Sequence, residues 1–340
     1  MKKFEKYSTN PENPNWEKAT KRETPLYPRN NDIRNDFERD YTRIIHSNAY
    51  RRLKHKTQVF FSPENDHICT RIEHVTHVES ISYSIAKNLG LNTELTKAIS
   101  VAHDIGHSPF GHEGEKILSE ISKRDLGCPF WHEKNGLEFV DNVELLEDNN
   151  KFMQNLDLTY AVRDGIISHC GEIDENCIRP REDYIDLKNY TFPNQYAPFT
   201  WEGCVVKISD KISYICRDIE DAITLGILDE HVDDLFALLN ITSKNEPINN
   251  TIIINDLIRD LCENSSPENG LCFSNEALNL MNKIKEFNYK HIYLSKRLEP
   301  SRRYFSIVIN EIYDLLKSTY DNVNTLNNLQ VLSKTYPKLG

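Results

Sequence analysis

Apolar residues recur at helical spacing through much of the chain. Over residues 74–88, valine and isoleucine return every three or four positions, and Gly90 follows as a helix C-cap. The same periodicity predicts further helices over residues 36–55, 93–105, 113–123, 137–147, 160–168 and 204–225. In FSNEALNLMNKIKEF, Ser274 is suited to be an N-cap, with Glu276 in the first turn. These patterns predict an all-α fold.

The remaining segments carry little periodic signal. Residues 1–35 are rich in Pro and Asn and predict an extended N-terminal arm, and residues 171–200 are rich in turn formers. Only TIIIN (251–255) and HIYL (291–294) are candidates for strands, and both are short. We expect a functional core over 36–228, followed by a C-terminal helical region over 229–340.

Composition limits the class of protein. The 340 residues are 39% hydrophobic and 27% charged, which is typical of a globular chain with a sizeable core. No run approaches the roughly 18 apolar residues of a membrane span, and the first residues are polar, so we expect no membrane partner and a cytoplasmic location. Eight cysteines without a C-x-x-C pair argue against a zinc ribbon or a disulfide framework, and we expect most of them to be reduced.

The net charge of −11 argues against binding nucleic acid over the whole surface. Basic residues nevertheless cluster within eighteen positions: Arg39, Arg43, Arg51, Arg52, Lys54 and Lys56. Such a cluster suits a small anionic ligand held together with a metal ion. A solvated basic helix face is the simpler interpretation.

A His-Asp dipeptide, His103-Asp104, is the first candidate for chemistry. About one such dipeptide is expected by chance, so it indicates a metal site only if further candidate ligands accompany it. His74, an earlier histidine on a predicted helix, is one such candidate. Adjacent helical positions point about 100° apart, so both side chains can reach one ion only at a helix end or across a groove. The break at Gly106 provides such an end. Imidazole and carboxylate suit Mn²⁺, Fe²⁺, Co²⁺ or Zn²⁺.

The predicted helix over 204–225 is amphipathic. Asp210, Tyr214 and Asp218 are spaced i, i+4, i+8 and therefore follow one line along its polar side. This line is either a solvent-exposed face or one wall of a cleft.

His112 and Glu115 are spaced i, i+3 at the start of a predicted helix and share a face. A carboxylate beside an imidazole orients it for general acid/base work. An exposed helix start with acidic residues near the positive end of the dipole is the alternative.

Four long blocks, taken in order and spacing, resemble one known family. They are RIIHSNAYRRLKHKTQVF, TRIEHVTHVESISYSIAKNLG, AHDIGHSPFGHEGE and SDKISYICRDIEDAI. These blocks are similar to the deoxyguanosine triphosphate triphosphohydrolase-like family of HD-domain phosphohydrolases. The resemblance covers residue 36 to about 225 and continues more weakly through FSNEALNLMNKIKEFNYKHIY.

The resemblance implies an HD-domain helical fold with additional C-terminal helices, and a homo-oligomer. It implies hydrolysis of dGTP or several dNTPs at the α-phosphorus, with a deoxynucleoside and inorganic triphosphate as products. The cofactor would be a divalent metal ion: Mn, Mg, Fe, Co or Zn.

The resemblance also implies roles for particular residues. The metal ligands would be His74, His103, Asp104 and Asp210. His112 would be catalytic with the support of Glu115, and His107 would face the phosphates. The substrate would contact Gln58, Arg71, Lys211, Tyr214, Asp218 and His132. The family often has an H-N-E-Q-like block where this chain reads FWHEKNGLEF, so only the histidine matches there.

Two other functions compete with this one. One is another HD phosphohydrolase, such as a nucleotidase or a phosphodiesterase. The other is a nucleotide-sensing or single-stranded nucleic-acid-binding oligomer, in which the basic segment 39–56 would bind the polyanion. The same segment is a candidate site for an allosteric nucleotide.

Overall fold

The computed structural model describes residues 2–24, 26, 32–61, 65–148, 150–170, 176–239 and 250–320. Helices dominate this part of the chain, so the all-α prediction is confirmed. Its single sheet pairs two antiparallel strands, β1 (Leu146–Glu147) and β2 (Met153–Gln154). The last residues of the predicted C-terminal region, 321–340, lie outside the described part.

The first α-helices are α1 (Trp16–Thr20), α2 (Asp36–His46), α3 (Asn48–Arg52), α4 (Arg71–Leu89), α5 (Thr93–Ala102), α6 (Gly111–Leu126) and α7 (His132–Glu138). They are followed by α8 (Tyr160–Ser168), α9 (Trp201–Thr224), α10 (Val232–Leu238), α11 (Asn250–Asn264), α12 (Asn275–Asn288) and α13 (Glu299–Tyr320). Short 3-10 and π turns connect several of them: η1 (Glu5–Tyr7), η2 (Leu53–His55), η3 (Phe139–Val143), η4 (Leu187–Asn189), η5 (Tyr289–Tyr293) and η6 (Lys296–Leu298).

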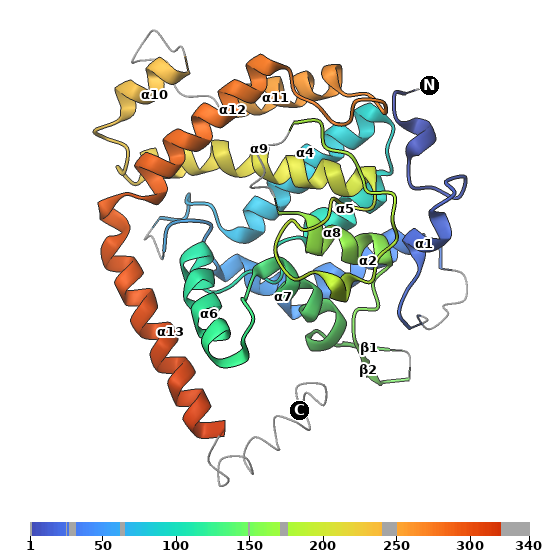
Figure 1. Ribbon diagram of the computed structural model, residues 1–340, viewed down its shortest axis with the longest axis horizontal. Helices are drawn as coiled ribbons and strands as arrows, with labels where there is room; N and C mark the ends of the chain where they lie inside the picture. Colours follow the sequence, from blue (N-terminus) through green and yellow to red (C-terminus); the bar gives the residue numbers. More distant parts are fainter. Residues whose placement is uncertain are drawn as a thin grey trace.

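Helix α4 lies at the centre of the molecule, against α5 and α9 (Figure 1). Its buried side chains belong to two hydrophobic clusters. Val75 and Val78 pack in a cluster with residues of α2, α5 and α8, whereas Ile81 and Ile85 pack in one with residues of α9, α11 and α12. Packing on both sides holds α4 in place, and with it the buried His74.

The ends of α4 are fixed by local chemistry. Thr70 and Glu73 form a capping box at its start. Gly90 ends the helix with φ 89°, a left-handed conformation that glycine adopts without a steric penalty. These caps fix where the helix begins and ends, and hence which turn carries His74.

Several predicted helix boundaries are wrong. The helix expected over 36–55 is divided, because Ser47 ends α2 and caps α3 with its side chain. The helix expected over 137–147 gives way to the π turn η3 and to β1. Helix α13 had no counterpart among the individual elements that the periodicity predicted.

Both strand candidates are helical. TIIIN lies in α11, which goes on to bury Leu257 and Leu261, and most of HIYL lies in η5. Short apolar runs fit both the strand and the helix periodicity. The longer amphipathic pattern around these runs favours a helix.

The N-terminal segment is not extended throughout, because it contains η1 and α1. Phe4 is fully buried and packs edge-on against Trp201 at the start of α9, with ring centroids 4.9 Å apart. The division of the chain at residues 35 and 228 remains a prediction, and helices α11 and α12 share a hydrophobic cluster with α9.

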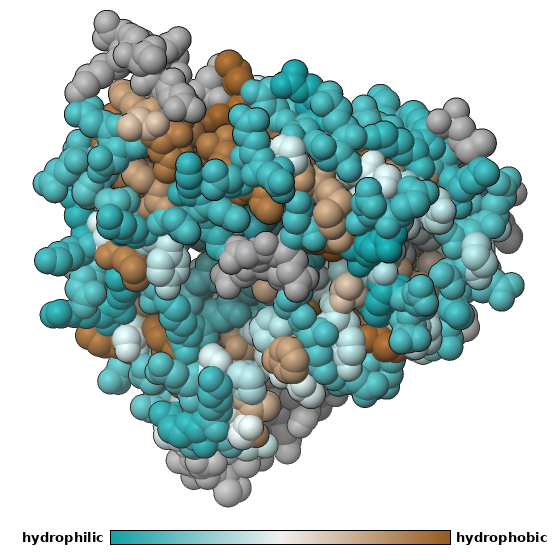
Figure 2. All heavy atoms as spheres, turned by 45° about the horizontal axis from the view of Figure 1, so that its top comes forward, coloured by the Kyte–Doolittle hydropathy of each residue, from teal (hydrophilic) through white to brown (hydrophobic). Residues whose placement is uncertain are grey.

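One pair of cysteines is oxidised, which is compatible with the expectation that most of the eight are reduced. A disulfide joins Cys177 to Cys272, whereas Cys69, Cys128, Cys204, Cys216 and Cys262 are free thiols. The face of the molecule in Figure 2 is largely hydrophilic, with hydrophobic side chains gathered toward its upper left. Within the described residues, no helix combines the length and the apolar character that crossing a bilayer requires.

Candidate active site

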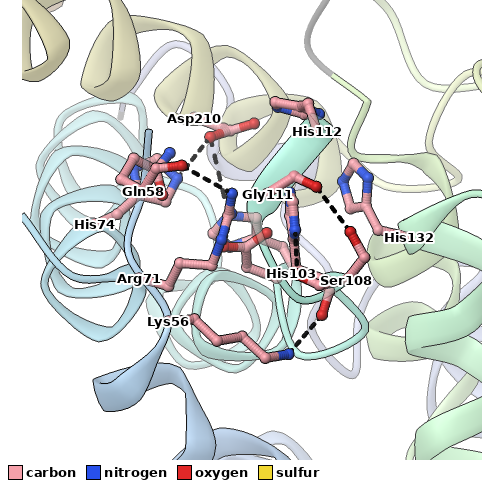
Figure 3. Close-up of polar contacts among 12 residues, drawn as sticks. Lys56, Gln58, Arg71, His74, His103, Ser108, Gly111, His112, His132 and Asp210 are labelled. Carbon is pink, nitrogen blue, oxygen red and sulfur yellow. Dashed lines mark hydrogen bonds and ion pairs between the residues drawn. The ribbon is translucent and has the colours of Figure 1, made fainter. Parts of the chain in front are cut away.

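Three helices bring the first group of site residues together. His74 comes from α4, His103 caps the end of α5, and Asp210 lies in α9. The Nε2 atoms of His74 and His103 lie 3.0 Å and 3.9 Å from Oδ1 of Asp210 (Figure 3). His103 thus lies at a helix end, which is one of the two arrangements that the spacing allowed for His103 and Asp104 to reach one ion.

The protonation of this group suits a cation. Nδ1 of His103 donates to the carbonyl of Ser100 at 2.7 Å, which leaves a lone pair on Nε2. That atom is buried and has no hydrogen-bond partner among the described residues. Burial lowers the pKa of His103 to about 4. Two imidazoles and one carboxylate, with an orphaned buried nitrogen among them, fit a divalent cation.

Asp104 has a different partner. Its Oδ2 lies 2.6 Å from Nη1 of Arg71, and both side chains are buried. Burial raises the pKa of this carboxyl, but the charges of Arg71 and the neighbouring histidines outweigh burial and hold the pKa well below the usual value. Asp104 is therefore the one predicted metal ligand that lies outside the group formed by the other three.

A second group follows along the loop after α5. It consists of His107, His112, Glu115 and His132. Oε2 of Glu115 lies 3.0 Å from Nδ1 of His132 and 3.5 Å from Nδ1 of His112. The side chain of His112 is 62% exposed, whereas that of Glu115 is 16% exposed. Burial raises the pKa of Glu115, but its bonds with both histidines outweigh burial and leave the pKa far below normal.

Two glycines close this loop onto α7. A Cβ at Gly106 would lie 2.1 Å from the backbone nitrogen of Gly136, so the two backbones meet where no side chain fits. Asn135 donates its side-chain amide to the carbonyl of Gly106 at 2.7 Å. This close approach places the ring of His107 in a stack on that of His132, with centroids 4.6 Å apart.

Two cationic side chains, Arg71 and Lys56, lie beside these groups. Arg71 also donates to the carbonyl of Gln58 at 3.2 Å, and Lys211 is buried in α9. Lys56 donates to the carbonyl of His107, and burial lowers the pKa of Lys56 to about 8. In the sequence, Lys56 was only part of a basic run, since nothing local marks its distant partner.

Some of the polar side chains that line up along α9 are buried. Asp218 is 2% exposed, and its Oδ2 accepts a hydrogen bond from the hydroxyl of Tyr293. Tyr214 is partly buried on the same helix, and Oε1 of Gln58 is buried without a partner among the described residues. The burial of Asp218 favours the cleft interpretation over the solvent face. Tyr293 was missed because it lies in a segment expected to be a strand.

The sequence analysis did not identify two further residues that lie beside His132. Glu133 is buried, and so is His169 at the end of α8. Nε2 of His169 lies 3.3 Å from Nε2 of His132. No spacing in the sequence connects His169 with the HD dipeptide, so only the fold identifies it.

Comparison with known proteins adds to this geometry. The HD domain family model matches residues 71–215. A deoxyguanosinetriphosphate triphosphohydrolase-like protein of Caldanaerobacter subterraneus subsp. tengcongensis is 35% identical over 297 residues, covering 87% of this chain and 75% of that protein. The chain belongs to this family. A relative of the same name from Desulfatibacillum aliphaticivorans is 33% identical over 294 residues, covering 85% of this chain and 75% of its own.

Membership of the deoxyguanosinetriphosphate triphosphohydrolase-like family makes the chain an HD-domain phosphohydrolase, and its clusters of histidine and carboxylate side chains could hold a divalent metal ion. Among solved structures, a hypothetical protein from Aquifex aeolicus has a TM-score of 0.47 and 20% identity, covering 82% of this chain. This chain spans 61% of that protein's length.

Proposed function

We propose that the protein hydrolyses deoxynucleoside triphosphates, dGTP or several dNTPs, to the deoxynucleoside and inorganic triphosphate. One observation carries the proposal. The segment from His103 to His112 joins a group that could hold a metal ion to the proposed acid/base group, and the buried Arg71 pairs with Asp104 in this segment. The names of the relatives support the same substrate class.

His74, His103 and Asp210 would hold the cation, with Asp104 beside them. When bound, a divalent cation stabilises negative charge that develops on phosphoryl oxygens.

The chain's own residues would bind the rest of the substrate. Arg71 and Lys211 add fixed positive charge for the triphosphate, and His107 faces the phosphates. Polar side chains would line the sugar: Gln58, Tyr214 and Asp218. Burial of the Gln58 and Asp218 oxygens supports this assignment, because a buried polar atom without a protein partner is suited to bind a ligand hydroxyl.

His112 would move the proton. Its Nδ1 faces Glu115, which leaves Nε2 for the substrate. Water attacks the α-phosphorus, the bond from phosphorus to the 5′ oxygen breaks, and Nε2 gives its proton to that oxygen. The attacking water releases one proton, which restores the ring. In the reverse assignment, Nε2 accepts a proton of the attacking water, and the pH dependence of kcat separates the two.

A direct assay tests the proposal. The protein is incubated with each dNTP and Mn²⁺ or Mg²⁺ in ¹⁸O-labelled water. The products are then separated and their masses are measured by mass spectrometry. Triphosphate carrying one ¹⁸O is expected, together with unlabelled deoxynucleoside. Release of pyrophosphate or of single phosphates would instead favour another HD phosphohydrolase, such as a nucleotidase or a phosphodiesterase.

A basic cavity favours one additional partner. The cavity, of about 560 Å³, is lined by α2 and α3 together with β1, and its lining includes four arginines, Arg34, Arg39, Arg43 and Arg51, with His46 and Glu147. We propose that it binds a polyanion, either an allosteric nucleotide or single-stranded DNA. The variant Arg51→Glu should weaken binding of a labelled dNTP or oligonucleotide. Lys54→Glu, an exposed change in the same segment outside the lining, should not.

We also propose that the chain forms a homo-oligomer. Helix α13 packs against α6 (Figure 1) and leaves large apolar side chains exposed, among them Ile307, Leu315 and Leu316. Light scattering after gel filtration should give a multiple of 39.6 kDa. A monomer at micromolar concentration would refute the proposal.

A further inference from the structure

Phe110 has an unusual backbone conformation at the start of the helix that carries His112. It is the N-cap of α6, with φ 63° and ψ 27°, in the left-handed region that residues other than glycine rarely adopt. Gly111, the next residue, also has φ 63°. These two residues set the direction in which α6 leaves the loop, and with it the position of His112. Phenylalanine gains no local hydrogen bond from this conformation, so its surroundings must hold it there.

Two other aromatic rings hold the ring of Phe110. It stacks on Phe305 of α13, with centroids 4.4 Å apart and 8° between the planes, and it meets Phe61 edge-on at 5.2 Å. Phe305 also meets Phe61 edge-on, at 5.0 Å. Phe305 is the buried member of this cluster at 5% exposed, whereas Phe61 is 41% exposed. The stack on α13 is therefore the contact of Phe110 that lies deepest in the protein.

Helix α13 contacts the first turn of α6 at two further positions. Nε of Arg302 lies 3.6 Å from Oε1 of Glu113, and a Cβ added to Gly114 would lie 3.5 Å from Cδ1 of Ile309. Arg302, Phe305 and Ile309 are spaced i, i+3, i+7 and so share one face of α13. Figure 1 shows the two helices side by side. One face of α13 thus supports the turn that carries the proposed acid/base histidine.

We infer that Phe305 is a positioning residue for His112 and acts through the backbone of Phe110. Nδ1 of His112 lies 3.5 Å from Oε2 of Glu115, and the centroid of its ring lies 5.1 Å from that of His107. The side chain of His112 is 62% exposed, so the position of its ring depends strongly on the turn that carries it. The effect on catalysis rests on the proposed function, whereas the support of the turn does not.

Hydrogen exchange tests the support of the turn without any substrate. In the full-length protein loaded with Mg²⁺, Phe305→Leu keeps an apolar side chain but removes the stack. The amides at the start of α6 should then exchange at least about tenfold faster, because the turn opens more easily. Phe287→Leu, a change at a phenylalanine of α12 that is 7% exposed, is the matched control and should leave this turn unchanged. Unchanged exchange in Phe305→Leu, or an equal increase in both variants, would overturn the inference.

A double-mutant cycle tests the route through Phe110. Phe305→Leu should lower kcat for dNTP hydrolysis by about 10–10² fold and leave KM within about twofold, because a displaced proton donor affects the chemical step more than binding. Phe110→Gly supplies a residue that adopts the left-handed conformation without a stacking partner. In that background, Phe305→Leu should lower kcat by less than about threefold. Equal effects in both backgrounds would overturn the role of Phe110.

The two measurements separate this inference from the proposed function. If the wild type hydrolyses no dNTP but Phe305→Leu still exchanges faster at the start of α6, the proposed function fails and the support of the turn stands. If the wild type hydrolyses dNTP and Phe305→Leu keeps the wild-type kcat, the proposed function stands and Phe305 is not a positioning residue for His112.

Discussion

Nη1 of Arg71 lies 2.6 Å from Oδ2 of Asp104, and both side chains are buried. The aspartate of the HD dipeptide is therefore tied to the first residue of α4, three positions before His74. The guanidinium thus connects the HD dipeptide to Gln58, because it also donates to the carbonyl of Gln58 at 3.2 Å. The ion pair also contributes to the fold, because each charge is buried only together with the other.

Breaking this pair should destabilise the protein. Asp104→Asn leaves the guanidinium of Arg71 buried without its carboxylate, and removing one partner of a buried pair typically costs about 3–5 kcal/mol. Urea unfolding should show this loss of free energy of unfolding. Lys116→Gln breaks the exposed pair with Glu113, at 2.9 Å, and should cost less than about 1 kcal/mol. Equal midpoints for the two variants would contradict the argument.

Removing the orphaned imidazole should weaken metal binding. His103 directs an unprotonated, buried Nε2 at the site, so His103→Gln should lower the affinity for Mn²⁺ by about tenfold or more. Titration calorimetry on metal-free protein measures this. His231→Gln, a change outside both groups, is the control. Full metal content in the His103 variant would remove this residue from the ligand set.

The family resemblance named His74, His103 and Asp210 as metal ligands, and the structure brings these three side chains together. Periodicity alone left the polar line of α9 open between a solvent face and the wall of a cleft. Lys56, His169 and Tyr293 could not be identified as site residues, since their partners are 37 or more residues away and no period connects them. Their positions follow from long-range packing.

The polar side of α9 shows a second limit. An amphipathic pattern separates apolar from polar positions, but it does not say whether water or protein covers the polar ones. Asp218 and Asp221 are both 2% exposed, although their spacing suits a solvent face. A buried polar face is typical of a ligand-binding or catalytic site. Only the tertiary structure distinguishes such a face from one that is exposed to solvent.

Replacing His112 should stop turnover while metal binding remains. The side chain is largely exposed and lies outside the group formed by His74, His103 and Asp210, so His112→Ala should leave folding and metal content unchanged. Loss of a general acid or base costs about 10²–10⁴ in rate. Glu113→Gln, a change on the same helix next to His112, should keep most of the activity. A decrease of less than about tenfold for His112→Ala would exclude His112 from proton transfer.

The carboxyl of Asp218 should make stability depend on pH. Burial raises its pKa from 3.8 to about 7, above the value in the unfolded chain. Between about pH 4 and pH 7, the folded state therefore keeps a proton that the unfolded state loses. Its contribution to stability is complete below about pH 4 and is lost as pH rises to about 7, by up to about 4 kcal/mol.

Asp218→Asn should reduce this loss, because an amide stays neutral at every pH. Urea unfolding at pH 5 and pH 7.5 should show a smaller decrease in the free energy of unfolding for the variant than for the wild type. Part of the decrease should persist, since burial also raises the pKa of Asp221, to about 6. Asp256→Asn, a change at an exposed carboxyl, should keep the wild-type difference. The same pH dependence in all three proteins would show that Asp218 is ionised in the folded state near pH 5, and that Tyr293 donates to a carboxylate rather than to a neutral acid.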